Sequence, residues 1–287
     1  MALTGDTKVY RIIGIEGFMS ILINKQERYV RPIDGWQDTF EGYMLHQLDT
    51  STGRRKVLEK LYVLSGRDVN ATIRNLSKLL RCRYACYGQC WSKNPDSDAM
   101  WRIYSYNQKA IQLITTVDDI QNMLEKSKWD DLEIEVDDVK YDIKDEKEAI
   151  NKILVWNAKI DAAYFHKRPA FEHEAEVRVL LNDFKKYETE YAFDIKTIHK
   201  NMKKVDKSKN EIEQILDAVS YIDKDKSSYT PSVPMEIGLK IPNLGQYITG
   251  VRIHPQAPDW YVALIGEICR QYKISFLGRS DLYRPVV

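Results

Sequence analysis

The 287-residue sequence has few cysteines and no long apolar run. Four cysteines are too few for a disulfide scaffold in a chain of this length, so a reducing, cytoplasmic setting is expected. No stretch approaches the roughly 20 apolar residues that a membrane-spanning helix needs. Residues 1–10 also lack the apolar segment of a signal peptide. These absences predict a cytoplasmic protein without a membrane partner.

The sequence also has almost no excess of charge of either sign. Lysine and arginine total 43 and the acidic residues 42, for a formal net charge of +1. A globally basic nucleic-acid-binding protein is therefore not expected. The Gly-x-Gly-x-x-Gly pattern and the Walker lysine motif are both missing, which argues against a kinase or a P-loop nucleotidase.

Short apolar runs alternate with helical patterns along the chain. Val9–Ile13 predicts a strand, and the spacing of Phe18, Ile21 and Leu22 predicts one buried face of a helix. Further helices are expected at 55–64, 68–81, about 99–104, 116–128, 146–166, 210–221 and 258–272. Further strands are expected at 29–31, 84–92, 110–115, 132–141, 176–181, 236–241, 247–254 and 274–277. This mixture predicts an α+β fold of short strands in mixed sheets with interspersed helices.

We expect residues 1–287 to form a single domain. Its core would span residues 8–182, and a strand–helix–strand unit at 236–287 would follow. Between them, residues 196–232 form a lysine-rich excursion. Its lysines could follow a phosphate backbone, but it lacks interleaved aromatic residues for base stacking. A solvated helix face or loop is the preferred interpretation.

Three carboxylates stand at a spacing of two in Glu172, Glu174 and Glu176, and Arg178 continues the row. On a strand, this spacing places all four side chains on one face. One interpretation is the solvated outer face of an edge strand, with Glu176 partly neutralised by Arg178. The other is a carboxylate pair in a cleft, an arrangement that stabilises a cationic sugar centre.

Other candidate site residues lie in the N-terminal half. Arg11 in the first strand either reaches the surface or faces a pocket, where a guanidinium suits phosphate binding. Ser92 at a strand end could bond a ligand hydroxyl, and Trp91 and Trp101 could wall a pocket for a flat ring; both tryptophans are equally compatible with a core. In the loop at 38–41, Phe40 would anchor a pocket wall, and Glu41 would pair with Arg11 or Arg178.

Cys82, Cys86 and Cys90 are spaced by four residues. Such spacing on a helix could bind a metal, but residues 84–92 have the pattern of a strand, and no histidine is near. Buried core cysteines are the preferred interpretation, and no metal site is expected.

Together these residues resemble a known enzyme class. An arginine on the first strand, a serine on a middle strand and a Glu-x-Glu on a later strand is the order found in arginine–serine–glutamate ADP-ribosyltransferases. The resemblance implies an ADP-ribosyltransferase-like fold with NAD as substrate. It implies that Arg11 holds the dinucleotide, Ser92 braces the site, Glu176 stabilises the oxocarbenium-like transition state and Glu174 orients the acceptor. The usual Ser-Thr-Ser run is absent, since Ser92 stands alone after Trp91.

A second resemblance rests on a series of short motifs in a fixed order. They are Tyr10-Arg11, the helix ending in Ile21-Leu22, Gln37-Asp38-Thr39-Phe40-Glu41, Cys90-Trp91-Ser92, Met100-Trp101…Tyr104 and Phe171 to Arg178. In these motifs the sequence resembles the bacterial family called domain of unknown function 2971 over about residues 8–180. Thr39, Phe171 and His173 stand where that family tends to have Pro, Trp and Tyr. Its members resemble proteins of bacterial conflict and defence loci, which implies a toxin or phage-defence effector with a neutralising partner.

The leading hypothesis is an NAD-dependent ADP-ribosyltransferase that modifies a nucleic acid or a protein. Its catalytic residues would be Glu176, Glu174 and Arg11, and its NAD-binding residues Tyr10, Arg11, Phe40, Trp91, Ser92 and Trp101. One alternative is a sensor or adaptor that binds a nucleotide or peptide without catalysis. The other is a metal-dependent nuclease with Glu172, Glu174 and Asp38 as Mg²⁺ ligands.

Overall fold

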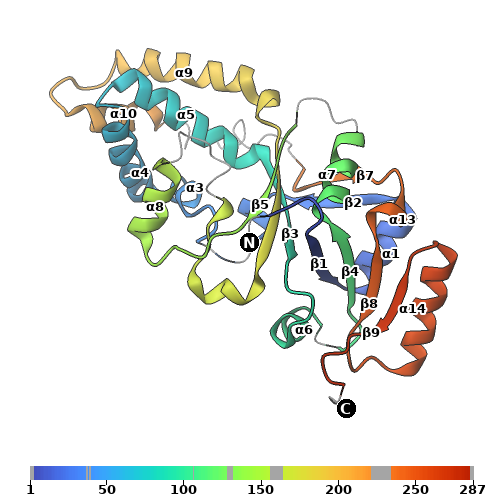
Figure 1. Ribbon diagram of the computed structural model, residues 1–287. Coiled ribbons are helices and arrows are strands. Elements are labelled where there is room, and N and C mark those ends of the chain that lie inside the picture. Colours follow the sequence, from blue (N-terminus) through green and yellow to red (C-terminus); the bar gives the residue numbers. More distant parts are fainter. Residues whose placement is uncertain are drawn as a thin grey trace.

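The computed structural model describes residues 3–284 except 37, 39, 106, 128–131, 156–163 and 221–233. Among these residues, nine strands form one sheet (Figure 1). Its main path runs β5-β6-β3-β1-β4-β8-β9, and β2 joins β3 to β7 beside it. The strands are β1 Lys8–Ile13, β2 Gln26–Val30, β3 Cys86–Ser92, β4 Ile111–Thr116, β5 Glu133–Asp138, β6 Glu176–Asn182, β7 Glu236–Lys240, β8 Gly250–Ile253 and β9 Phe276–Arg279. All pairings are antiparallel except that of β8 with β9. The α+β class is thereby confirmed.

Helices connect the strands and gather in two regions. Figure 1 shows α4, α5, α9 and α10 together on one side, far from α14 at the opposite end of the sheet. The helices are α1 Ile15–Asn24, α2 Pro32–Gly35, α3 Tyr43–Gln47, α4 Ser51–Leu64, α5 Val69–Ala85, α6 Asp98–Tyr104, α7 Val117–Lys126, α8 Glu146–Val155, α9 Glu188–Met202, α10 Glu211–Val219, α13 Leu244–Tyr247 and α14 Asp259–Gln271, with 3-10 turns η2 Pro169–Glu174 and η3 Phe184–Tyr187.

Local sequence signals place several of these elements correctly. The predicted N-cap Thr116 accepts a hydrogen bond from the Asp119 backbone N–H at 3.1 Å, and α7 begins directly after it. Phe18, Ile21 and Leu22 all lie buried on the inner face of α1. These elements form as expected because their start signals and apolar faces are local.

Other expectations were wrong at their boundaries. The helix expected at 68–81 continues to Ala85, so the strand expected from residue 84 begins at Cys86. The helix expected at 146–166 does not reach His166, which forms a β-bridge with Lys140; residues 156–163 of that prediction lie outside the described part. The strand expected at 132–141 ends at Asp138 as β5, and its Ile134 is 40% exposed, because β5 ends the strand order and is covered less than the central strands.

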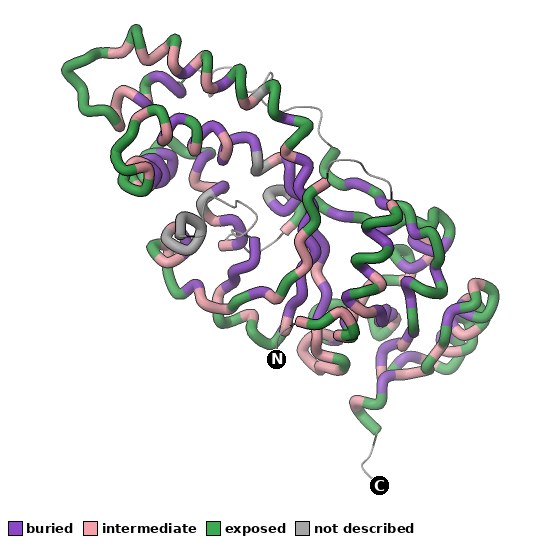
Figure 2. The backbone as a smooth tube through the Cα atoms, turned by 45° about the horizontal axis from the view of Figure 1, so that its top comes forward, coloured by how far each residue is buried: buried purple, intermediate pink, exposed green. Residues whose placement is uncertain are grey.

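Two apolar clusters cover opposite faces of the central strands. Along β6, Val177, Val179 and Leu181 belong to one cluster, while Leu180 belongs to the cluster under α4, α5, α9 and α10. Every residue of β6 is therefore buried. Figure 2 shows the buried backbone concentrated along these central strands. Polar side chains on β6 are thus placed inside the molecule rather than on an outer face.

Within the described residues, no helix has the length and apolar character that crossing a membrane demands. The lysine-rich excursion comprises the end of α9, a turn and α10, with 221–233 outside the described residues. The helix expected at 210–221 is confirmed as α10.

Candidate functional site

Three neighbouring strands place one residue each in a single row across the sheet. Tyr10 of β1 lies opposite Ser92 of β3, and Ser92 lies opposite Glu176 of β6. Directly opposed residues of antiparallel strands point to the same face. The strands expected to carry the arginine, the serine and the glutamate are therefore adjacent, but Tyr10 rather than Arg11 shares the row of Ser92 and Glu176.

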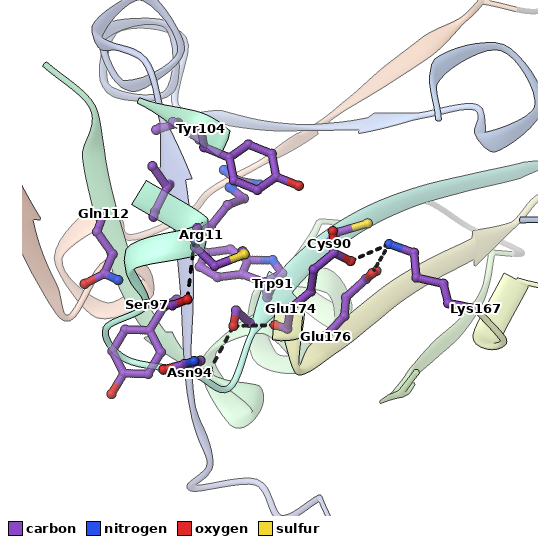
Figure 3. Close-up of a pocket in the computed structure, with 15 residues that line it drawn as sticks. Arg11, Cys90, Trp91, Asn94, Ser97, Tyr104, Gln112, Lys167, Glu174 and Glu176 are labelled. Carbon is purple, nitrogen blue, oxygen red and sulfur yellow. Dashed lines mark hydrogen bonds and ion pairs between the residues drawn. The ribbon is translucent and has the colours of Figure 1, made fainter. Parts of the chain in front are cut away.

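A pocket of about 220 Å³ opens beside this row. β1 and β3 pair at one position, Tyr10 with Ser92, and no other pair joins them, so a gap lies between them further along. Of the predicted site residues, six line the pocket: Tyr10, Arg11, Trp91, Ser92, Glu174 and Glu176. Figure 3 shows the two glutamates on one side, pointing to Lys167, and Tyr104 of α6 on another.

The Glu172–Glu176 row is not a strand face, which corrects the sequence prediction. Glu172 and Glu174 belong to the 3-10 turn η2, and Ala175 then adopts a left-handed conformation with φ of 43°. Glu172 is exposed, whereas Glu174 and Glu176 are buried. Pro169 starts the 3-10 turn, so residues 169–174 cannot continue β6 toward its N-terminus.

The end of β3 holds this turn in place. The Ser92 hydroxyl donates to the Glu174 carbonyl oxygen at 2.6 Å and accepts from the Asn94 backbone N–H at 3.0 Å. The Lys93 N–H donates to the Ala175 carbonyl at 2.8 Å. Ser92 therefore braces the backbone between the two glutamates.

A buried ion cluster forms the acidic end of the pocket. The Lys167 Nζ lies 2.8 Å from Glu41, 2.7 Å from Glu174 and 2.8 Å from Glu176. Arg178 contacts Glu176 at 2.6 Å and Glu41 at 3.1 Å, and its side chain is fully buried. The expected ion pair between Glu41 and Arg178 is thereby confirmed. The interpretation of the carboxylate row as the solvated outer face of an edge strand is wrong, because Glu174, Glu176 and Arg178 are buried. Three carboxylates against two cations give the cluster a charge of −1.

These neighbours set the ionisation of the buried groups. Burial opposes the charged form of Glu176, but the positive charges of Arg178 and Lys167 outweigh it and lower its pKa to about 2. Burial raises the pKa of Glu41 despite the same two cations. Burial also raises the pKa of Tyr104 to about 12, and the charge of Glu174 adds to that effect. The neighbouring carboxylates also raise the pKa values of Lys167 and Arg178, so Glu176, Lys167 and Arg178 stay ionised at neutral pH.

Arg11 reaches the pocket from the opposite face of the sheet. Its guanidinium donates to both oxygens of Glu27, at 2.8 and 2.9 Å, and stacks 4.7 Å from the centre of the Trp91 ring. Its Nε is buried with no hydrogen-bond partner. Glu27 is 1% exposed and also accepts from Gln89 at 2.7 Å. Arg11 is thus a cation paired with Glu27, and its buried Nε has no hydrogen-bond partner.

Two predicted NAD-binding residues do not line the pocket. Trp101 is fully buried, donates to Asp96 at 2.9 Å and packs against His254. Phe40 stacks on Tyr43 and lies under the Arg168 guanidinium. Both aromatic side chains are therefore parts of the packing around the site, since tertiary contacts occupy their faces.

The carboxylates expected to bind a metal do not converge. Asp38 pairs with Arg168 at 2.7 Å, Glu174 pairs with Lys167, and Glu172 is exposed. In the part of the chain that the structure describes, no group of three His, Cys, Asp or Glu side chains could hold a metal ion. The nuclease hypothesis therefore lacks its proposed ligand set.

The three cysteines spaced by four residues lie in two different elements. Cys82 lies in α5, whereas Cys86 and Cys90 are free cysteines of β3, and Cys86 is fully buried.

Lys167 and Tyr104 are site residues that the sequence analysis missed. Lys167 directly follows the helix expected at 146–166 and was given no role, and Tyr104 was noted only as part of a motif. A usable signal for Lys167 was charge balance, because buried glutamates require buried cations and Arg178 alone could not neutralise three. No local pattern marks which lysine supplies that charge.

Comparison with known proteins identifies part of the chain. Neither a curated protein nor a solved structure matches. A family model does match, over residues 100–179, from α6 through the glutamates and Arg178 in β6. Tyr10, Arg11 and Ser92 lie outside the matched segment. Residues 100–179 thus match the family described as "Protein of unknown function (DUF2971)".

Proposed function

We propose that this protein binds NAD in the pocket between β1 and β3 and transfers its ADP-ribose to a macromolecular acceptor. In this reaction the bond between the ribose C1′ and the nicotinamide nitrogen breaks, and its electron pair leaves with nicotinamide. A nucleophilic oxygen or nitrogen of the acceptor then bonds to C1′ and loses its proton to Glu174.

The row of Tyr10, Ser92 and Glu176 beside the pocket is the observation that supports this proposal most directly. The cluster behind the row carries a charge of −1, which favours a ligand that becomes positively charged as its glycosidic bond breaks. Glu176 uses each carboxylate oxygen in one ion pair and retains lone pairs for a ribose hydroxyl.

Arg11 and two residues of α6, Tyr104 and Met100, would bind the rest of the ligand. Arg11 lines the pocket and its positive charge would attract a phosphate group, while Glu27 already neutralises part of that charge. Tyr104 and Met100 of α6 provide an apolar wall for the nicotinamide ring. The volume of about 220 Å³ suits one end of the dinucleotide, so the adenosine would lie outside the pocket.

Binding without turnover is the second candidate. Both oxygens of Glu176 are held by cations, and such pairing reduces the electrostatic help that a carboxylate gives to a cationic transition state. A nucleotide sensor with the same pocket would bind NAD without releasing nicotinamide.

The test is nicotinamide release from NAD by the purified protein, with total cell lysate as the acceptor source. The Glu176→Gln and Glu174→Gln variants should each lose at least tenfold in rate. Glu172→Gln is the matched control, because Glu172 is an exposed carboxylate of the same segment outside the pocket lining. It should retain the wild-type rate.

Calorimetric titration with NAD separates the two candidates. Binding together with release supports the transferase, and binding without release by the folded wild type supports the sensor. Absence of both would refute an NAD site in this pocket.

A further inference from the structure

We infer that Lys167 is a positioning residue that aims Glu174 and Glu176 into the pocket together. This inference rests on the proposed function for its catalytic meaning. Its physical content, the control of two carboxylates by one ammonium group, can be tested without turnover.

The contacts of Lys167 account for all of its donor capacity. An ammonium group carries three N–H donors, and the Lys167 Nζ has three carboxylates within 2.8 Å. These carboxylates come from three different elements: the loop before α3, the turn η2 and the strand β6. Lys167 is therefore the point where these elements meet.

The backbone of Lys167 is held as firmly as its side chain. Its N–H donates to the Lys140 carbonyl at 2.8 Å, and its carbonyl accepts from the Ile143 N–H at 3.1 Å. The side chain is 8% exposed and lines the pocket. Because the backbone is hydrogen-bonded and the ammonium group has three ion pairs, the position of the Nζ is fixed. This fixed Nζ orients the carboxylates of Glu174 and Glu176.

Glu174 depends on Lys167 more than Glu176 does. Glu176 has a second cation in Arg178, whereas the ion pair of Glu174 is with Lys167. Ala175 separates the two glutamates by a left-handed turn, so strand geometry does not align them. The shared ammonium group brings their carboxylates together despite that turn.

Replacing Lys167 by a neutral residue changes the cluster charge from −1 to −2. Like charges in a buried site favour protonation, and Lys167 is one of the two cations that lower the pKa of Glu176, so that pKa should rise. The other titratable and charged groups that face this cluster are Glu41, Arg178, Cys90, Tyr104 and Tyr141. Of these, Arg178 supplies the remaining positive charge.

The experiment follows the side-chain carboxyl carbons of glutamates by NMR between pH 1.5 and pH 8, a range that includes the low pKa of Glu176. Selective ¹³C labelling resolves the signals, and the Glu174→Gln and Glu176→Gln proteins assign them. Wild type, Lys167→Gln and Lys167→Arg are compared. Arg168→Gln is the matched control, because Arg168 is the adjacent cation, pairs with Asp38 and is outside the pocket lining.

In Lys167→Gln the assigned midpoint of the Glu176 carboxyl should rise by about one pH unit or more. Lys167→Arg should restore the wild-type midpoint, and Arg168→Gln should leave it unchanged. The acid limb of nicotinamide release should move to higher pH by the same amount. A folded Lys167→Gln protein with unchanged midpoints would overturn the inference, since a purely structural lysine changes stability alone.

Two further outcomes keep the inference separate from the proposed function. Shifted carboxyl midpoints in a protein that releases no nicotinamide would support the role of Lys167 and refute the transferase. If Lys167→Gln does not fold, the wild-type titration decides, because a Glu176 carboxyl that protonates above pH 5 in the wild type overturns the inference.

Discussion

Ser92 lies directly opposite Glu176 in the register of β3 and β6, and its hydroxyl bonds the carbonyl of Glu174, two residues earlier. One serine therefore fixes the backbone on both sides of Ala175, where the chain turns from η2 into β6. The hydrogen bond from Ser92 holds the backbone of the two glutamates, and Lys167 holds their carboxylates.

Ser92→Ala should destabilise the protein by about 1–3 kcal/mol, because the buried Glu174 carbonyl and the Asn94 N–H each lose a partner. Urea unfolding measures the change. The control is Ser220→Ala, which removes an exposed hydroxyl that also donates to a backbone carbonyl, and it should change stability by less than about 0.5 kcal/mol. Equal effects of the two substitutions would show that Ser92 does not brace the turn.

Glu176 should make stability depend on pH in the acid range. Its pKa is about 2 in the folded protein and 4.5 as an ordinary glutamate, so the folded state favours the ionised form. Its contribution is present above pH 4.5 and is lost as the pH falls toward 2. Glu41, whose pKa is raised, acts in the opposite direction.

Unfolding free energies measured from pH 7 to pH 3 check this linkage. The wild type should lose stability below about pH 4.5, and Glu176→Gln should show a flatter curve over that range. The exposed-site variant Glu172→Gln should follow the wild-type slope. A Glu176→Gln curve parallel to the wild type would contradict the assigned ion pairs.

Gly88→Ala should be destabilising by about 1–3 kcal/mol, as expected for overpacking. A Cβ at Gly88 would lie 2.4 Å from the Trp36 ring, which itself packs 4.0 Å from the guanidinium of Arg178. Gly17→Ala is the contrasting control: its Cβ would meet Ile13 at an ordinary 3.8 Å, and alanine favours the helix α1. Thermal unfolding should therefore shift in opposite directions for the two variants.

The C-terminal segment should control the order of α6, which walls the pocket. Asp96 accepts from the hydroxyl of Ser280, at 2.7 and 2.6 Å to its two oxygens, and from Trp101 at 2.9 Å. Ser280→Ala should increase hydrogen exchange in α6 and weaken ligand binding in the pocket. Exchange rates in α14 serve as the internal reference, and an unchanged α6 would exclude this connection.

Much of the site was predictable because its residues occur in strands with strong local signals. The positions of Tyr10, Ser92 and Glu176 follow from three correctly located strands, and sheet order then made them neighbours. Trp101 and Phe40 do not line the pocket, and their aromatic character suits a pocket wall and a core equally. The prediction was wrong at Glu172, because Pro169 and Ala175 replace the expected strand by a turn.

The sequence by itself determined the α+β class, the start of α7 and the buried face of α1, because caps and periodicity act over a few residues. Only the tertiary structure decided that Lys167 meets Glu41, Glu174 and Glu176, and that Arg11 pairs with Glu27. Buried charges must find partners, but many cations in the chain could satisfy that need. The packing of elements distant in sequence selects the pair that forms.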